Sequence, residues 1–271
     1  MKHTEIRVRT KFGEQARMYT YFLDNSPEMD PARKRPLVLI CPGGGYHMTS
    51  DREAEAVAVQ FLSMGFHACV LRYSVKPAEF PQALCELAWC VNHLRSNAGE
   101  YAIDPNRIIV LGFSAAGHLA ASLGVFWQEA WLSKAAGLPS AQIRPDGLIL
   151  CYPVITAGEY AHQGSIENLL GEKDTPDMRD AVSLEKHVTS LVPPVFLWHT
   201  QKDNTVPVEN ALLLINELQK HKVPMEVHIF AEGLHGLSLA NEETKNKDGY
   251  GVQECCQIWP KLAGDWIRGM K

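Results

Sequence analysis

The segment RIIVLGFSAAGHLAASLG, from Arg107 to Gly124, constrains the fold of this chain more than any other. Its first half is a short continuous apolar run, which is typical of a strand buried on both faces. Its second half is rich in small residues and predicts a helix that begins at Ala115. Ser114 lies at the sharp turn between the two. The sequence therefore predicts a serine hydroxyl exposed above a sheet, with a helix N-terminus beneath it.

Strands and helices alternate along the chain from Leu37 onward. Short apolar runs predict strands at Leu37–Cys41, His67–Tyr73, Arg107–Val110, Gly147–Val154, Pro194–Thr200 and Met225–Phe230. Apolar residues at helical spacing predict helices that follow Asp51, Pro81, Ser114, Val208 and Val252.

Two alternating segments, Glu5–Thr10 and Met18–Leu23, precede this pattern and predict an antiparallel hairpin at a sheet edge. The whole order predicts an α/β fold, with an eight-stranded, mostly parallel sheet and helices on both of its faces.

We expect a single domain over residues 1–271, because no linker, repeat or low-complexity tract divides the chain. Two stretches, 126–145 and 156–190, fit the alternation less well. Both are expected to lie over the carboxyl ends of the strands, where open α/β sheets bind ligands. Either stretch is a candidate for a small lid or a substrate-contacting insert.

Charge and composition exclude several classes of partner. The net charge is −5 and the isoelectric point about 6.1, so no basic field attracts nucleic acid or an anionic membrane. No apolar run approaches the roughly 18 residues of a membrane span, and the N-terminus does not resemble a signal peptide. We expect a cytoplasmic protein; its oligomeric state stays open, a homodimer included.

The seven cysteines are odd in number and lie mostly in apolar segments. This distribution indicates small core residues rather than a disulfide framework. No C-x-x-C pair occurs, and the histidines do not fall at zinc spacing near the cysteines. We therefore expect neither a metal nor a cofactor.

A glycine-rich loop, CPGGGY, directly follows the strand that ends at Cys41. Three successive glycines allow backbone N–H groups to converge on one point, as stabilisation of a developing oxyanion requires. We assign the N–H groups of Gly44, Gly45 and Ala115 to this role. A phosphate-binding loop is the alternative, but the Lys-Ser/Thr pair of that motif is missing.

The strict nucleophile motif has glycine two residues before and two residues after its serine. Here Gly112 precedes Ser114, but Ala116 replaces the second glycine, and Gly117 follows it. The alternative interpretation is that Ser114 only caps a helix, as serine often does.

A carboxylate and a histidine follow the last two predicted strands. Asp203 comes shortly after Thr200, and His235 lies in a glycine-flanked loop after Phe230. Serine, acid and histidine then occur in the chain order that a nucleophile of this kind requires. The histidine would accept the proton of Ser114, and the carboxylate would hold the imidazole in the correct tautomer.

Other histidines and carboxylates compete for these two roles. Four histidines are expected to be structural because of their positions in strands or helices: His118, His199, His221 and His228. The alternative acids, Glu172 and Asp174, lie in a loop after the sixth strand.

Four residues near the expected site are candidates for walls of the substrate pocket: Tyr46, His47, Tyr152 and Trp198. Asp51 and Glu53 also follow the glycine loop. For these two, the simpler interpretation is a favourable interaction with a helix N-terminus.

With these residues in place, the chain resembles the acetyl-xylan-esterase-like branch of the α/β-hydrolases, which is related to the feruloyl-esterase and lipase families. The segments that carry the resemblance are CPGGGY, GFSAAGHLAASL, PPVFLWHTQKDNTVPVENALLL and EGLHGLSLA. It implies a serine carboxylesterase that removes short acyl groups, often acetyl, from sugars such as xylo-oligosaccharides. It also implies Ser114, Asp203 and His235 as catalytic residues and a small-molecule ester as the binding partner.

Two alternatives stay open. The same constellation of residues serves amide hydrolases of the kynurenine formamidase type. A binding protein that retains the fold without its chemistry is the other alternative. The sequence shows no large hydrophobic lid, which argues against long-chain lipids as substrates.

Overall fold

Eight strands pair into one sheet in the order β1-β2-β4-β3-β5-β6-β7-β8, in a computed structural model that describes residues 1–270. The strands are β1 (Lys2–Arg7), β2 (Arg17–Phe22), β3 (Arg35–Cys41), β4 (His67–Arg72), β5 (Ile103–Phe113), β6 (Gly147–Cys151), β7 (Val195–Thr200) and β8 (Met225–Phe230). β2 pairs antiparallel with both β1 and β4, and the remaining pairs are parallel. The predicted α/β fold with an N-terminal hairpin is confirmed.

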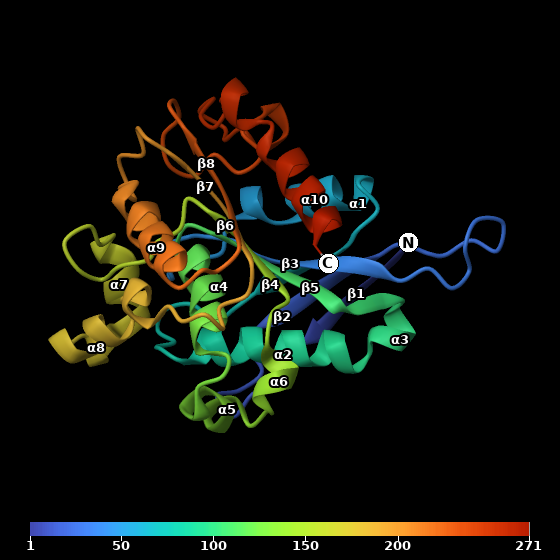
Figure 1. Ribbon diagram of the computed structural model, residues 1–271, viewed down its shortest axis with the longest axis horizontal. Coiled ribbons are helices and arrows are strands. Elements are labelled where there is room, and N and C mark those ends of the chain that lie inside the picture. The colour runs from blue at the N-terminus through green and yellow to red at the C-terminus, as the bar shows by residue number, and fades with distance from the viewer. Residues whose placement is uncertain (271) are drawn as a thin grey trace.

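Helices cover both faces of this sheet (Figure 1). One face carries α1 (Glu55–Ser63) and α10 (Trp259–Gly269), and the other carries α2 (Gln82–Ser96), α4 (Ala115–Phe126) and α9 (Glu209–Lys220). The shorter helices are α3 (Ala98–Tyr101), α5 (Ala130–Ala136), α6 (Ser140–Ile143), α7 (Gln163–Leu170) and α8 (Pro176–Ala181). Short 3₁₀ turns are η1 (Asp51–Glu53), η2 (Gly171–Lys173), η3 (Leu184–His187), η4 (Glu242–Thr244) and η5 (Glu254–Cys256).

The central strands read as continuous apolar runs because both of their faces are buried. In β3, Leu37 and Leu39 belong to the core under α2 and α4, whereas Val38 and Ile40 belong to the core under α1 and α10. Successive side chains of a strand point to opposite faces, so each strand contributes to two separate cores.

Several elements have other bounds than predicted: β1 begins and ends three residues earlier, and β5 extends from Ile103 to Phe113. Two further differences have a local cause. β6 ends at Cys151 rather than Val154, because Tyr152 takes a positive φ of 38° and Pro153 follows it. The last helix begins at Trp259 rather than near Val252, and the 3₁₀ turn η5 precedes it. Both differences occur where local backbone geometry interrupts an apolar pattern.

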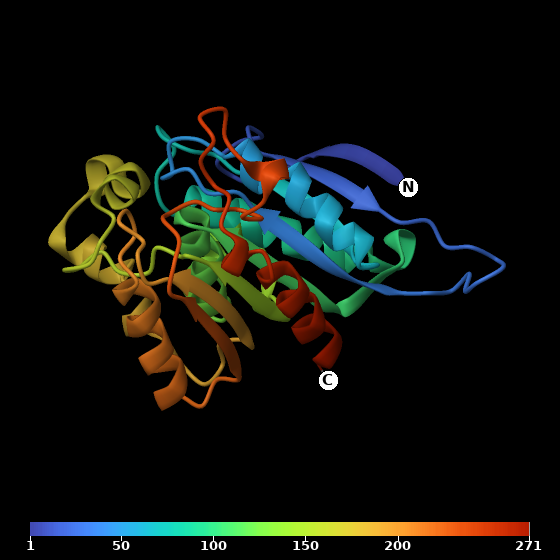
Figure 2. The same ribbon diagram turned by 90° about the horizontal axis from the view of Figure 1, so that it is seen from above.

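The two inserts lie in different places. Residues 126–145 form α5 and α6, which pack against α2 (Figure 1), and Arg95 of α2 donates to the Gln142 carbonyl at 2.9 Å. The expectation that this stretch lies over the strand ends is wrong, because α2 offers it a helical face to pack on. Residues 156–190 instead carry α7 and α8, at the end of the molecule opposite the long loop between β2 and β3 (Figure 2).

All seven cysteines are free thiols, and six of them are buried; Cys255 is exposed. In the part of the chain that the structure describes, no helix combines the length and the apolar character needed to cross a bilayer. Within the same residues, no group of three His, Cys, Asp or Glu side chains is placed to hold a metal ion.

Buried histidines predict how the stability of the fold depends on pH. Burial lowers the pKa of His67 and of His118 to about 4 each. In the unfolded chain both would titrate near pH 6.5. Between about pH 6.5 and pH 4 the unfolded chain therefore binds protons that the folded chain does not. The free energy of unfolding should fall as the pH falls, by about 1.4 kcal/mol per pH unit for each histidine.

Urea denaturation between pH 7 and pH 4.5 measures this dependence, with His118→Gln as the comparison. The slope of the unfolding free energy against pH should be smaller in the variant by the contribution of one proton. The contributions of the other groups cancel when the two slopes are subtracted. Equal slopes for the two proteins would contradict the assignment.

Candidate active site

Ser114 lies at the turn between β5 and α4 with φ +54° and ψ −120°. A residue with a side chain rarely adopts this region, and its presence at a turn between strand and helix is a form of stored strain. Close approach of the two elements holds it there. A Cβ at Gly112 would lie 2.0 Å from the Ala116 carbonyl oxygen, and one at Gly117 would lie 2.6 Å from Cβ of Pro153. Gly112 and Gly117 are thus positions where a side chain does not fit, and the buried Ala116 lies between them in sequence.

Three side chains predicted from the sequence meet at the carboxyl ends of the strands. The Ser114 Oγ lies 2.7 Å from Nε2 of His235, and Nδ1 of His235 lies 2.7 Å from Oδ2 of Asp203. Because the Asp203 carboxylate can only accept, the His235 proton sits on Nδ1, and Nε2 is left to accept from the Ser114 hydroxyl. A continuous hydrogen-bonded chain thus joins the three residues.

Asp203 is buried and held by four donors. Its Oδ1 accepts from the backbone N–H groups of Thr205 and Val206, at 3.0 and 2.9 Å. Its Oδ2 also faces Nε2 of His199 at 3.3 Å, besides Nδ1 of His235. Burial alone would raise the pKa of Asp203, but the hydrogen bonds from His199, His235 and the Thr205 backbone outweigh it and hold the pKa well below its usual range. The carboxylate is consequently charged beside the imidazole.

The glycine loop lies against Ser114. Gly44 and Gly45 have φ of +132° and +62°, so their conformations favour glycine. The N–H of Gly43 donates to Glu53 Oε2 at 2.8 Å. Across residues 1–270, by contrast, the N–H groups of Gly44, Gly45 and Ala115 donate no hydrogen bond within the protein. These unpaired donors beside the serine can receive an oxyanion.

A cleft of about 490 Å³ opens over Ser114 and His235. Its walls come from the glycine loop, from the turn that follows it, from α7 and the residues that precede it, and from the loops that carry Asp203 and His235. Residues 156–190 therefore contribute to the cleft, through His162, Gly164 and Asn168, whereas residues 126–145 do not.

One of the four proposed pocket residues lines this cleft, namely His47. The other three are buried elsewhere. The Tyr46 hydroxyl lies 3.1 Å from Nδ1 of His118, under the loop. Tyr152 points into the protein, where its hydroxyl bonds Glu53. Trp198 stacks on Trp259 in the core beneath α10. The prediction that these three form pocket walls is wrong, because their aromatic rings are turned inward, where they bury a large apolar area.

The competing histidines and carboxylates lie in other surroundings. His118 donates from Nε2 to the Val182 carbonyl at 2.8 Å, and His228 pairs with Glu226 on its own strand. His221 follows the last turn of α9. Asp174 is held by Arg179 at 2.6 Å, and Glu172 is exposed.

His199 is the one competitor that lies close to the site. Its Nε2 faces both the Val206 carbonyl, at 3.0 Å, and Asp203. It therefore contacts the same carboxylate oxygen, Oδ2, that His235 contacts.

The sequence did not reveal the role of Glu53. This residue is 4% exposed and accepts hydrogen bonds on both carboxylate oxygens, rather than lying at the surface of a helix N-terminus. His162 and Asn168 of the cleft were also missed, since polar residues in an irregular insert carry no distinguishing pattern.

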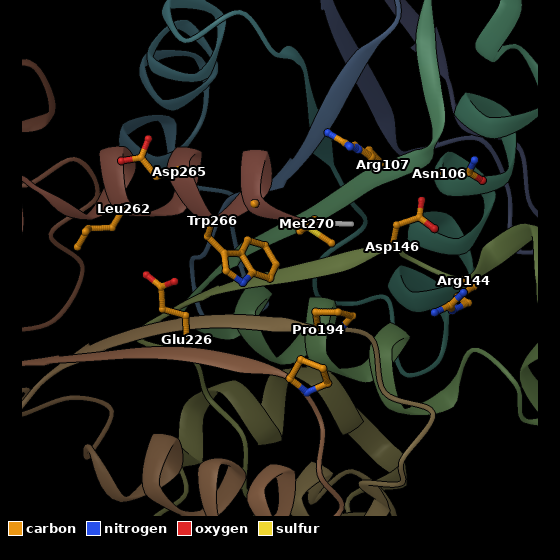
Figure 3. Close-up of a pocket in the computed structure, with 12 residues that line it drawn as sticks. Asn106, Arg107, Arg144, Asp146, Pro194, Glu226, Leu262, Asp265, Trp266 and Met270 are labelled. Carbon is orange, nitrogen blue, oxygen red and sulfur yellow. The ribbon is translucent and has the colours of Figure 1, made fainter.

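A larger cavity of about 890 Å³ lies elsewhere, among α10 and the residues at which β6, β7 and β8 begin (Figure 3). Trp266, Arg107 and Glu226 are among its lining residues. Among residues 1–270, its lining includes no serine, cysteine or histidine, and the cavity lies at the strand ends opposite those where open α/β sheets bind ligands. The smaller cleft over Ser114 is therefore the candidate active site.

Solved structures of several hydrolases resemble this chain over nearly its whole length. The carboxylesterase Cest-2923 from Lactobacillus plantarum WCFS1 superposes with a TM-score of 0.88 at 29% identity, covering 99% of this chain and 97% of that one. The acetyl ester-xyloside bifunctional hydrolase from Caldicellulosiruptor lactoaceticus gives a TM-score of 0.78 at 38% identity, with 93% and 87% covered. The fold thus places the chain in the α/β-hydrolase superfamily, among structural neighbours that include carboxylesterases.

The chain belongs to the BD-FAE family, whose model matches residues 25–218. Among curated proteins, it is 40% identical over 216 residues to endo-1,4-beta-xylanase B of Butyrivibrio fibrisolvens, covering 78% of this chain and 34% of that protein. It is 27% identical over 204 residues to the acetylxylan esterase of Xylanibacter ruminicola, covering 73% and 40%. The chain thus spans less than half the length of these curated relatives.

The close packing at the serine turn predicts the effect of a single methyl group. Gly112→Ala should lower the free energy of unfolding by about 1–3 kcal/mol, because the new Cβ overlaps a backbone carbonyl of α4 and the helix must shift. Gly99→Ala is the control, since nothing lies within 4 Å of its added Cβ, and it should keep or raise stability by up to about 1 kcal/mol. Chemical denaturation of both variants measures the difference; equal stabilities would refute the packing argument.

Proposed function

We propose that this chain is a serine esterase that removes short acyl groups, acetyl above all, from sugar esters such as acetylated xylo-oligosaccharides. The observation that carries the proposal is the hydrogen-bonded chain from Ser114 through His235 to Asp203, lying beside unpaired backbone donors in a cleft. These are the parts that acyl transfer to a serine requires.

Acylation begins when Nε2 of His235 takes the hydroxyl proton of Ser114 and the Ser114 oxygen attacks the acyl carbon. The charged Asp203 offsets the positive charge on the imidazole while it holds the second proton. The protonated imidazole then donates to the departing alcohol oxygen. Water enters, loses a proton to the same nitrogen and attacks the acyl-enzyme, which releases the acid and restores Ser114.

The tetrahedral intermediate of each step places a negative charge on the former carbonyl oxygen. The N–H groups of Gly44, Gly45 and Ala115 supply donors for it in a fixed geometry. Removing one such donor typically costs about 10²–10³ in kcat. The glycine loop and the start of α4 thus stabilise the charge that develops in each step.

Polar side chains around the cleft favour an alcohol with several hydroxyl groups. His47, His162 and Asn168 line the cleft and offer ring nitrogens and an amide to hydroxyl partners. The names of two relatives, an acetylxylan esterase and an acetyl ester-xyloside hydrolase, are consistent with such an alcohol.

Removing the nucleophile tests the proposed mechanism. Ser114→Ala should lower turnover of p-nitrophenyl acetate by about 10⁴–10⁶-fold, because no oxygen remains to form the acyl-enzyme. Thermal unfolding should stay close to that of the parent protein. Ser63→Ala, at the exposed end of α1, is the matched control and should retain full turnover. Substantial activity in Ser114→Ala would reject the assignment.

Substrate preference is tested with a panel of esters and amides. Turnover should be highest for acetylated xylo-oligosaccharide and for acetyl among p-nitrophenyl esters, and it should decrease as the acyl chain lengthens. N-formylkynurenine is the amide arm of the panel, and preference for it would favour a formamidase instead. Absence of labelling by a fluorophosphonate probe would instead identify a binding protein without this chemistry.

A further inference from the structure

Glu53 is a buried carboxylate at the floor of the cleft for which the mechanism above has no use. It ends the 3₁₀ turn η1, ten residues after Gly43, and lies among the residues that line the cleft. Its Oε2 accepts from the Gly43 N–H at 2.8 Å, and its Oε1 accepts from the Tyr152 hydroxyl at 2.6 Å. A buried carboxylate is costly unless its oxygens are paired, so both contacts are needed to keep it there.

The same hydrogen-bonded chain continues to the loop that carries the catalytic histidine. The Tyr152 hydroxyl accepts from the Ser238 N–H at 2.8 Å, three residues after His235. The ring of Tyr152 also packs edge-on against the His235 ring, with centroids 5.1 Å apart. One buried chain, Gly43–Glu53–Tyr152–Ser238, therefore joins the glycine loop to the histidine loop through the end of β6.

Two residues in this chain of contacts have a strained backbone conformation. Tyr152 has φ of 38° and Ser238 has φ of 54°, both in the region that favours glycine. Such conformations persist only where surrounding contacts over-determine them. In this conformation the hydroxyl of Tyr152 contacts both Glu53 and Ser238, so the strained backbone allows the two loops to be joined.

The fit around Glu53 is close on the side of the serine. A Cβ added at Gly43 would lie 2.8 Å from Glu53 Oε2 and 3.0 Å from Cβ of Ser114. Gly43 thus lies pressed between the carboxylate and the nucleophile. We therefore expect a displacement of the Glu53 carboxylate to displace Gly43 as well.

We propose that Glu53 is a positioning residue that sets the oxyanion donors of the glycine loop in register with Ser114 and His235. The proposal rests on the function proposed above. Two donors, the Gly43 N–H and the Tyr152 O–H, point at the two oxygens of Glu53. A carboxylate accepts from both, whereas an amide at the same place presents its own N–H₂ group to one of them.

Burial raises the pKa of Glu53, and the hydrogen bond from Tyr152 opposes that change.

Glu53→Gln and Tyr152→Phe test the proposal, singly and together. Each single variant should lower kcat for p-nitrophenyl acetate by about 10²-fold, the loss that a misplacement of about 1 Å produces. KM should stay within about threefold, because neither group binds the substrate in its ground state. The double variant should lose no more than the larger single loss, since the two residues act as one unit.

Tyr101→Phe is the matched control, because it removes a hydroxyl bonded to His93 at 3.3 Å, outside the site. It should keep the parent kcat. Additive losses in the double variant, an unchanged kcat in Glu53→Gln, or an equal loss in the control would overturn the proposal.

Hydrogen exchange followed by mass spectrometry supplies a measurement that needs no activity. Peptides covering residues 41–48 and 233–240 should exchange faster in Glu53→Gln and in Tyr152→Phe, while the rest of the sheet exchanges as in the parent protein. If the parent protein neither turns over esters nor reacts with a fluorophosphonate, the proposed function fails, and the exchange data still decide whether Glu53 positions the two loops. Unchanged exchange in both peptides would refute it; if Glu53→Gln does not fold, Tyr152→Phe carries the test alone.

Discussion

The strained turn at Ser114 is the constraint on which the other parts of the site depend. Ser114 has a φ of +54°, and close packing maintains it: Gly112 admits no side chain against α4, and Gly117 admits none against Pro153. That packing also brings the N-terminus of α4 beneath the serine, with the Ala115 N–H next to it. The side chains of Asp203 and His235 then need only reach the edge at which the parallel strands end.

Sequence patterns predicted those groups well, for a physical reason. Asp203 follows β7, a fully buried strand that is recognisable as a continuous apolar run, and His235 follows β8, a partly buried edge strand with alternating apolar residues. Patterns could not predict which way a side chain turns once the strand has ended. Tyr46 and Tyr152 lie in backbone of positive φ, and that conformation, set by tertiary contacts, turned their rings into the protein rather than toward the cleft. Glu53 was missed for the same reason, since its partners Gly43 and Tyr152 are brought together only by the fold.

The carboxylates of Asp203 and Glu53 both lie near His235, and their different surroundings shift their pKa values in opposite directions. Asp203 receives hydrogen bonds from two histidines and two backbone N–H groups, which hold its pKa low. Glu53 receives only the Gly43 N–H and the Tyr152 hydroxyl, and burial raises its pKa. Divergent environments of paired carboxyls are a recurrent way of dividing roles in an active site. Here the division favours Asp203 as the charge beside the imidazole and Glu53 as a fixed point for the loops.

The insert that carries α7 connects specificity to the catalytic geometry. Asn168 lines the cleft, and its Nδ2 donates to the Gly45 carbonyl at 2.9 Å. The opposite side of the same peptide loop is held by Glu53 through Gly43. The glycine loop is therefore hydrogen-bonded on two sides. One partner is Asn168 of the insert, which lines the cleft, and the other is the buried carboxylate of Glu53. Under the proposed function, changes in α7 that alter the alcohol a cleft accepts would also shift the oxyanion donors. Relatives with different substrates are then expected to vary the insert while keeping an acceptor for the Gly43 N–H, because only the second contact is independent of the substrate.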